Sequence, residues 1–473
     1  MFFLTLDKSK GEEKYIYQQI YRGIKNAIFA GELQSNEKLP SKRNLAKELD
    51  VSVNSVTNAY EQLLAEGYIY SLERKGYYVE NIAQFIIKDD QQQNKLPPDL
   101  KEKIADKEGW LSLSHMTADI SSFPFKDWMK YQEKAIKNHK IELSEITHPQ
   151  GPYLVRKSIA RLIKLTRGIL CEPEQIVIGA GTQSLIRNAM SMQNAETIVA
   201  IENPGYSRFY KMLKKMEFDV RPIPLDDEGI DIQQIEASHA RFVFVTPSHQ
   251  FPTGKIMPIS RRIELLNWSV QQENRYIVED DYDSEFKYET DNIPSLQSLD
   301  RNQRVIYTGT FSKTMLPGLR ISYMVLPPEM LREYRDHNAD LIQDSNTLGL
   351  YTLHYFIENG DYNRHVKRMN HQYELKRKLL IKQLQTTFGT SVEIEDIPAG
   401  LHFLAYFHTS RSYEEIMKRA TQVKLEIYSM KRFMLSKKEC ATGSIGLVIG
   451  FANIHEDQIS EAVKRLSKIL EQT

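Results

Sequence analysis

Residues 305–313 read Val-Ile-Tyr-Thr-Gly-Thr-Phe-Ser-Lys. The apolar, β-branched first half predicts a buried strand, and the polar second half places Lys313 just beyond its end. Four similar apolar runs come earlier in the chain, with longer helical patterns between them, at 176–178, 198–201, 242–245 and 276–278. Apolar strands that alternate with helices predict an α/β fold with a mostly parallel sheet covered on both faces.

Polar residues follow each of these predicted strands, at the edge where an α/β sheet binds its ligands. The glycine-containing turn 179–183 would cradle a phosphate with backbone N–H groups at a helix start. Taken singly, Lys313 is more often a solvated lysine and Asp280 a turn residue. Together the strand ends offer an amine for an aldehyde, a carboxylate for a pyridine nitrogen, and hydroxyls with an arginine for a phosphate. They predict a pyridoxal 5'-phosphate site, and we expect no metal site.

The N-terminal region predicts the order helix, helix, turn, helix, hairpin. An apolar stripe at helical spacing covers 16–28, and Ser41 and Ser52 are placed to cap the second and third helices. The runs 68–70 and 77–79 predict the hairpin. The side chains expected to face inward from the third helix are Val56, Tyr60, Leu63 and Leu64. This order is typical of a winged helix-turn-helix.

Composition and hydropathy indicate the class of protein, but they do not identify a binding partner. Lys+Arg and Asp+Glu both number 62, so overall charge does not predict nucleic-acid binding. No apolar stretch approaches membrane-spanning length, and the apolar N-terminus is too short for a signal peptide, which predicts a cytoplasmic protein. A polar stretch at 81–109 separates the N-terminal helix-and-hairpin pattern from the alternating strand-and-helix pattern of the rest of the chain. We therefore expect a winged helix-turn-helix at 1–80, a linker at 81–109 and a large domain at 110–473.

The chain resembles MocR-type regulators, a branch of the GntR group. The matching motifs of the large domain are 246–254, 279–286, 307–320 and 399–403, and those of the N-terminal region are 40–46 and 59–68. The resemblance implies a DNA-binding transcription regulator that joins a winged helix-turn-helix to a type I aminotransferase-fold domain with a C-terminal α+β subdomain. Within the family, the motifs 148–151, 204–208 and 431–433 resemble the GabR-type branch, which responds to 4-aminobutyrate.

The resemblance also implies roles for single residues. Lys313 would form the Schiff base, Asp280 would bind the ring nitrogen, Tyr282 the ring hydroxyl, and Tyr206 would stack on the ring. The other cofactor contacts, chiefly to the phosphate, would be Gly181, Thr182, Gln183, Thr310, Ser312 and Arg320. Arg208 and Arg432 would bind the carboxylate of an effector, which suits the planar guanidinium group.

The resemblance further implies a double-stranded DNA operator and a head-to-tail homodimer, in which the DNA-binding domain of one chain lies against the large domain of the other. The residues expected at the DNA are Ser41, Arg43, Ser52, Asn54, Thr57, Asn58, Arg74, Lys75 and Gly76. Relatives usually carry arginine directly after the cap of the third helix, where this chain has Val53. We expect this change to alter operator sequence or affinity.

Three functions remain open from the sequence. The first is a regulator that senses a small amino acid, foremost 4-aminobutyrate, through an external aldimine with bound pyridoxal phosphate. The second is an active aminotransferase with an accessory DNA-binding domain. Phe251 stands where related aminotransferases place asparagine to contact the ring hydroxyl, so we expect at most slow transamination. The third is a regulator that senses pyridoxal phosphate itself, for which Arg208 and Arg432 would have no evident use.

Overall fold

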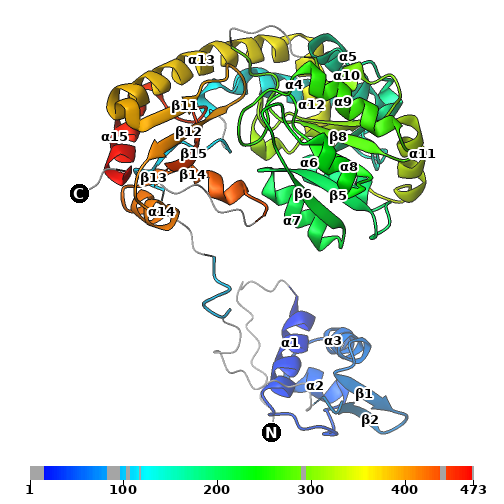
Figure 1. Cartoon of the computed structure of the whole chain (residues 1–473). Helices are drawn as coiled ribbons and strands as arrows, with labels where there is room; N and C mark the ends of the chain where they lie inside the picture. Colours follow the sequence, from blue (N-terminus) through cyan, green and yellow to red (C-terminus); the bar gives the residue numbers. More distant parts are fainter. Residues whose placement is uncertain are drawn as a thin grey trace. The chain divides into compact units, whose positions relative to one another are not determined.

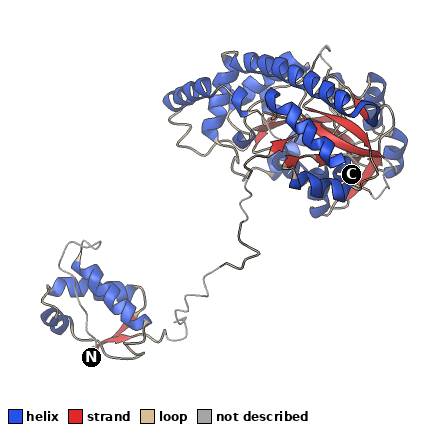
Figure 2. Cartoon of the chain, turned by 90° about the vertical axis from the view of Figure 1, so that its left-hand side faces the viewer, coloured by secondary structure: helices blue, strands red, loops and turns tan. Residues whose placement is uncertain are grey.

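The computed structural model describes residues 15–82, 96–102, 107–116, 119–288, 294–436 and 444–470. The chain divides into two compact units, Met1–Asp106 and Lys107–Thr473 (Figures 1 and 2). Much of the predicted linker, 83–95 and 103–106, lies outside the described residues.

The small unit has the predicted order of elements. It contains α1 (Ile16–Phe29), α2 (Lys42–Glu48), α3 (Val53–Ala65) and an antiparallel hairpin of β1 (Ile69–Leu72) and β2 (Gly76–Val79). Ser41 Oγ accepts the Asn44 N–H at 3.2 Å, and Ser52 Oγ accepts the Ser55 N–H at 3.1 Å. These side-chain caps satisfy helix N–H groups that would otherwise lack a partner, and they fix where α2 and α3 begin. The predicted winged helix-turn-helix is confirmed.

One inward-facing residue of the third helix was predicted wrongly. Val56, Tyr60 and Leu63 are fully buried against α1 and the hairpin, whereas Leu64 is 39% exposed. The buried positions follow the three- and four-residue spacing of one helical face, and the residue after Leu63 is rotated by about 100° away from that face. Leu64 therefore points to the surface.

The large unit is built on a seven-stranded sheet with the order β4-β10-β9-β8-β7-β5-β6. The strands are β4 (Ile176–Gly179), β5 (Ile198–Asn203), β6 (Asp219–Pro224), β7 (Phe242–Val245), β8 (Tyr276–Asp281), β9 (Val305–Thr310) and β10 (Ser322–Val325). Only β10 runs antiparallel to its neighbours among these strands, so the predicted, mostly parallel sheet is confirmed. The sequence prediction omitted β6, an edge strand that tolerates two prolines, and the short β10.

Helices cover both faces of this sheet. They are α4 (Phe125–Asn138), α5 (Tyr153–Arg167), α6 (Thr182–Met190), α7 (Ser207–Lys215), α8 (Ile232–Ser238), α9 (Ile259–Val270), α10 (Leu296–Leu299), α11 (Pro328–His337) and α12 (Thr347–Glu358). Alternate strand residues serve opposite faces. Ile176 and Ile178 pack with α4, α5 and α12, whereas Val177 packs with α6, α7 and α11.

The C-terminal α+β subdomain follows the long helix α13 (Asp361–Phe388), which Figure 1 shows running from the large sheet towards it. Its elements are β11 (Val392–Glu395), β12 (His402–His408), α14 (Tyr413–Gln422), β13 (Leu425–Glu426), β14 (Tyr428–Ser429), β15 (Ser444–Gly450) and α15 (Ile459–Leu470). Strand β13 pairs in parallel with β3 (Leu111–Ser112), which lies near the start of the large unit. None of the helices in the described ranges is both long and apolar enough to cross a bilayer.

Candidate functional site

A cavity of about 320 Å³ lies at the carboxyl ends of the parallel strands. Arg208 lines this cavity, and so do all ten predicted cofactor contacts. These ten are Gly181, Thr182, Gln183, Tyr206, Asp280, Tyr282, Thr310, Ser312, Lys313 and Arg320. They come from the ends of β4, β5, β8 and β9 and from the turn before β10. Topology therefore gathers residues from widely separated parts of the chain into one site.

One end of the cavity suits a phosphate group. Helix α6 begins there behind Gly181, whose φ of +112° favours glycine. A Cβ at this position would lie 2.0 Å from Arg320 Nη2, so glycine also makes room for the guanidinium group. Ser312 Oγ is buried and has no hydrogen-bond partner among the described residues. Helix N–H groups, a hydroxyl and an arginine are the donors that a phosphate dianion requires.

A partly buried carboxylate, Asp280, also lines the cavity. Asp280 Oδ1 accepts a hydrogen bond from Thr308 Oγ1 at 3.0 Å. Burial raises the pKa of Asp280 to about 7, the Thr308 hydrogen bond acts against this rise, and the charges of Asp281 and Asp283 add to it. A carboxylate in this state is stabilised by a cationic N–H group, such as a protonated pyridine nitrogen.

Lys313 is the amine of the cavity. Its Nζ donates a hydrogen bond to the backbone carbonyl of His115 at 2.7 Å. Burial lowers the pKa of Lys313 to about 8; Asp283 opposes this shift and Arg208 adds to it. A lowered pKa makes the neutral, nucleophilic form of the amine more accessible near pH 7.

Three aromatic side chains, Tyr206, Phe251 and Tyr282, also line the cavity. Phe251 packs edge-on against Tyr206 and Tyr282, with ring centroids 5.8 and 5.9 Å away. Tyr282 Oη donates to the His249 carbonyl at 3.0 Å and lies 3.0 Å from His249 Nδ1. Since Phe251 has no polar side-chain atom, Tyr282 supplies the phenol at this point of the wall.

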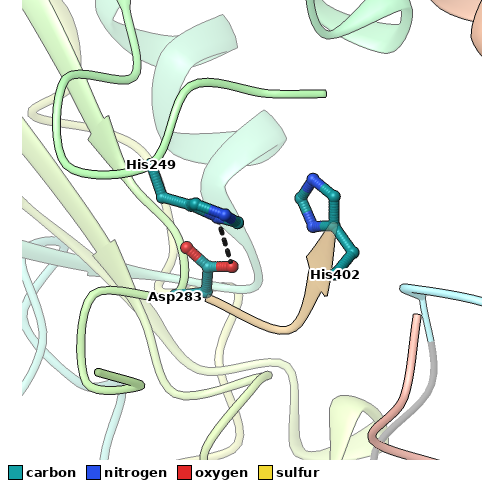
Figure 3. Close-up of side chains that lie close together, drawn as sticks. All are labelled: His249, Asp283 and His402. Carbon is teal, nitrogen blue, oxygen red and sulfur yellow. Dashed lines mark hydrogen bonds and ion pairs between the residues drawn. The ribbon is translucent and has the colours of Figure 1, made fainter. Parts of the chain in front are cut away.

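His249, which contacts Tyr282, forms a group of three buried side chains with Asp283 and His402 (Figure 3). His249 Nδ1 lies 3.0 Å from Asp283 Oδ2, which also accepts the Leu401 N–H at 3.1 Å. Because the carboxylate accepts, His249 carries a proton on Nδ1. His402 Nε2 lies 3.2 Å from the Pro252 carbonyl. The possible metal-ligating atoms of His249, Asp283 and His402 lie within 4.8 Å of one another, and the hydrogen bonds engage one atom of each.

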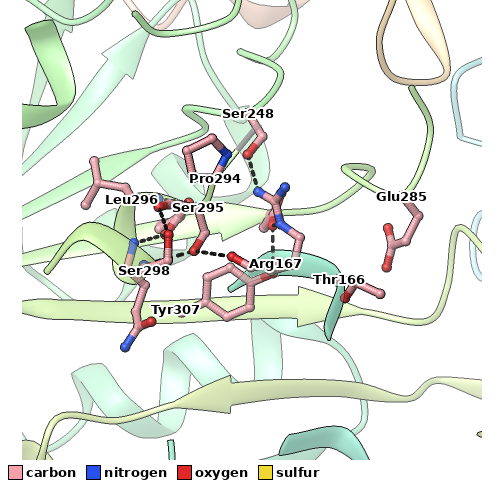
Figure 4. A network of polar contacts seen from close by, with 12 residues as sticks. Thr166, Arg167, Ser248, Glu285, Pro294, Ser295, Leu296, Ser298 and Tyr307 are labelled. Carbon is pink, nitrogen blue, oxygen red and sulfur yellow. Dashed lines mark hydrogen bonds and ion pairs between the residues drawn. The ribbon is translucent and has the colours of Figure 1, made fainter. Parts of the chain in front are cut away.

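Arg167 and Asp281, the last residue of β8, form a buried ion pair, and Figure 4 shows Arg167 beside Ser248 and Tyr307. Arg167 Nε is 2.7 Å from Asp281 Oδ2, and Arg167 Nη2 donates to Ser248 Oγ at 2.6 Å. Tyr307 Oη donates to the same Asp281 oxygen at 2.6 Å. These contacts join α5, the β7 loop and β9 to the strand that carries Asp280.

The two predicted effector arginines are placed differently. Arg208, in the first turn of α7, lines the cavity. Arg432 lies in the 3-10 helix Met430–Phe433, is exposed, and has its Cζ 4.8 Å from the Tyr428 ring centroid. The structure therefore brings Arg208, but not Arg432, into the cavity wall.

His115 lines the cavity and was not foreseen as a site residue. It is 5% exposed, and neither ring nitrogen has a hydrogen-bond partner within the described ranges. Burial lowers the pKa of His115 to about 3, with further contributions from the charges of Lys313, Arg432 and Arg208. It follows the two-residue strand β3 far from any motif, so sequence offered no signal for it. Other lining residues that were not assigned roles are Met116, Phe209, Thr246, Pro317 and Ser322.

The residues predicted to contact DNA lie on α2, α3 and the hairpin of the small unit. Ser41 and Ser52 are exposed caps, and Thr57 is half-buried. The side chains exposed to solvent in this set are Arg43, Asn54, Asn58, Arg74 and Lys75. Arg74 and Gly76 have φ values of +59° and +112° in the hairpin turn. Val53 is 44% exposed in the first turn of α3.

Comparisons with known proteins match both units. The family described as aminotransferase class I and II matches residues 110–466, and the gntR family of bacterial regulatory proteins matches 16–79. The uncharacterized HTH-type transcriptional regulator YdeL of Bacillus subtilis (strain 168) is 36% identical over 452 residues, which cover 95% of this chain and 96% of YdeL. The probable rhizopine catabolism regulatory protein MocR of Rhizobium meliloti is 28% identical, over 95% of this chain and 93% of MocR.

A solved structure shows the fold of the large unit. The α-aminoadipate aminotransferase LysN of Thermus thermophilus, complexed with N-(5'-phosphopyridoxyl)-L-leucine, superposes with a TM-score of 0.67 at 22% identity. The match covers 78% of this chain and 95% of LysN. The predicted aminotransferase fold is therefore confirmed.

Replacing Arg167 with methionine should destabilise the large unit by about 3–5 kcal/mol, because Asp281 would remain buried without its cation. Arg161→Met, on the same helix, is the control. Its Nη1 pairs with Glu358 Oε2 at 2.8 Å from a side chain that is 55% exposed, and its loss should cost about 0–1 kcal/mol. Urea unfolding followed by amide exchange in β8 measures both. Equal losses would contradict a stabilising role for the buried pair.

Proposed function

We propose that this protein senses a small amino acid through bound pyridoxal phosphate. The premise is its family: the chain belongs to the MocR-type transcription regulators, which join a GntR-family DNA-binding domain to an aminotransferase class I and II domain. The observation that carries the proposal is the convergence of all ten predicted cofactor contacts on one cavity. The cavity belongs to a chain whose other unit is a winged helix-turn-helix.

The residues present fit pyridoxal phosphate at each end. When bound, this group supplies an aldehyde that a primary amine can join and an electron-poor ring. Lys313 would hold it covalently, Asp280 would accept from the ring nitrogen, and Tyr282 would contact the ring hydroxyl. The residues that would bind the phosphate are Gly181, Thr182, Gln183, Thr310, Ser312 and Arg320. Tyr206 would stack on the ring.

The effector of this proposal is a small ω-amino acid, foremost 4-aminobutyrate. An amine is required because only a primary amine can exchange with Lys313. A carboxylate is required because Arg208 adds a cation to the cavity lining that is not one of the proposed cofactor contacts. Arg432, whose side chain is exposed on the 3-10 helix Met430–Phe433, would then join when the effector is bound. The GabR-type motifs at 148–151, 204–208 and 431–433 support this choice.

We also propose that the protein acts as a homodimer on an operator with two half-sites. Exposed apolar side chains around α4 and α5 support a second copy as partner: Met129 is 60%, Ile146 79% and Leu165 70% exposed. Exposed apolar surface of this kind is typical of protein–protein contacts. The head-to-tail arrangement rests on the family resemblance.

Active transamination is the second candidate function. The lowered pKa of Lys313 and the raised pKa of Asp280 favour it, because both belong to amine chemistry on pyridoxal phosphate. Phe251 opposes it, since it cannot donate to the ring hydroxyl. Sensing of pyridoxal phosphate itself is a third candidate, against which the cavity position of Arg208 counts.

Purified protein should carry a chromophore attached to Lys313, because this amine lines the same cavity as the proposed ring and phosphate contacts. Lys313→Ala should abolish covalent attachment, measured by borohydride reduction and peptide mass. Lys164→Ala, an exposed lysine of α5, is the matched control and should keep it. A Lys313→Ala protein that still traps the cofactor by reduction would exclude Lys313 as the attachment point.

Full-length protein should bind its own upstream DNA more tightly than random DNA, and Arg43→Ala or Arg74→Ala should weaken this binding. A lost base contact should relax sequence preference and cost about 1–3 kcal/mol, whereas a lost phosphate contact should weaken all sequences and reduce the salt dependence. Fluorescence anisotropy at several salt concentrations separates the two, with Lys164→Ala as control. Equal affinity for upstream and random DNA at low salt would argue against the regulator.

Arg208→Ala should weaken 4-aminobutyrate binding by roughly ten- to a hundredfold, because it removes a charge-assisted hydrogen bond, while the cofactor remains attached. Arg432→Ala should weaken it in the same direction. Titration of the cofactor absorbance measures both variants. Rapid, repeated transamination with a keto acid acceptor would favour the enzyme over the sensor. Absence of any spectral response to ω-amino acids would reject this effector class and leave the fold unaffected.

A further inference from the structure

The lining of the cavity includes residues that are left over when the proposed cofactor contacts are assigned. Two of its polar side chains already have partners: Thr246 Oγ1 donates to Glu202 Oε2 at 2.7 Å, and Ser322 Oγ donates to Thr310 Oγ1 at 2.8 Å. Both ring nitrogens of His115, in contrast, are buried and have no partner in the described part of the chain. Buried polar atoms are rarely left unpaired in proteins, so a nearly buried imidazole on a cavity wall indicates a missing ligand group.

We propose that His115 determines specificity by donating a hydrogen bond from an imidazole N–H to the carboxylate of the amino-acid effector. The inference rests on the proposed function and names a further contact for the effector beyond the two arginines. His115 lies at the same cavity as Arg208, so the two side chains would bind one acid group together.

The surroundings of His115 define what it can bind. Its ring lies among Phe251, His402, Tyr428 and Phe433, with centroids 5.1–5.7 Å away. Burial and the charges of Lys313, Arg432 and Arg208 keep the imidazole neutral at physiological pH. A neutral imidazole has one N–H donor, and a carboxylate is an acceptor. The same three cations favour an anion at this place.

The position of His115 also limits the length of the effector. Its backbone carbonyl accepts the hydrogen bond from Lys313 Nζ, the atom that an incoming amine would replace, at 2.7 Å. The imidazole of the same residue therefore lies within one side chain of the amine position. An amino acid that reaches both must have a short chain between amine and carboxylate.

Holoprotein variants test the proposal with two probes of matched chain length, 4-aminobutyrate and n-butylamine, titrated by cofactor absorbance. His115→Phe keeps an aromatic ring and removes both nitrogens, so it should weaken 4-aminobutyrate binding about ten- to a hundredfold and leave n-butylamine unchanged. His115→Gln restores a donor and should recover most of the lost affinity. Absorbance before titration checks that each variant holds the cofactor.

A second measurement needs no variant that might misfold. In protein labelled with ¹⁵N-histidine, the His115 ring signals should shift more on addition of 4-aminobutyrate than with n-butylamine, because both amines displace Lys313 but only 4-aminobutyrate carries a carboxylate. Equal weakening of both probes in His115→Phe, or no weakening of either, would overturn the proposal, as would equal shifts of the ring signals with the two probes. Wild-type protein that binds n-butylamine but no amino acid would instead refute the proposed effector class, and a wild-type protein without cofactor would refute the proposed function.

Discussion

The ion pair between Arg167 and Asp281 fixes the part of the sheet on which the site depends. Arg167 ends α5, Asp281 ends β8, and Ser248 and Tyr307 bring the β7 loop and β9 to the same pair. The buried ion pair thus connects β8 with β9 and with the loop that follows β7. Because successive strand side chains point to opposite faces, holding Asp281 on the α5 side directs Asp280 into the cavity. The position of the carboxylate in the site is set by a contact outside it.

Several acids lie around this point: Glu202 and Glu279 are buried, Asp280 and Glu285 are partly buried, and most accept hydrogen bonds from neutral donors. Burial raises the pKa of Glu202, Glu279 and Asp280 to about 7 and that of Glu285 to about 8. Glu279 accepts two backbone N–H groups, from Leu296 and Gln297, each at 2.8 Å. Asp280 accepts from Thr308 and faces the cavity, whereas arginines line other parts of the wall. The cavity therefore favours a ligand that is cationic at one point and anionic at others, which is the charge pattern of a pyridinium ring carrying a phosphate.

The sequence predicted the parts of the fold that local patterns determine. Apolar runs marked five of the seven strands of the large sheet, and Ser41 and Ser52 marked two helix starts, because burial and capping act within a few residues. Because the carboxyl ends of parallel strands meet at one edge of a sheet, the sequence also predicted that the polar residues after these strands lie together in one cavity. The roles of these residues stay predictions. Leu64 was assigned inward because helical phase is easily misjudged by one residue at the edge of an apolar face. His115 could not be found, because its place in the cavity depends on the pairing of β3 with β13, which lies far away near the other end of the chain.

That pairing also relates the site to the start of the large unit. Leu111 and Leu113 donate to the carbonyls of Lys424 and Glu426, and the Gly450 N–H donates to the carbonyl of Leu113. The chain thus enters the unit along the C-terminal subdomain and reaches Lys313 two residues later, at the carbonyl of His115. A ligand that engages Lys313 must compete with this hydrogen bond. The residue that accepts this hydrogen bond thus lies within the first ten residues of the large unit, which begins at Lys107.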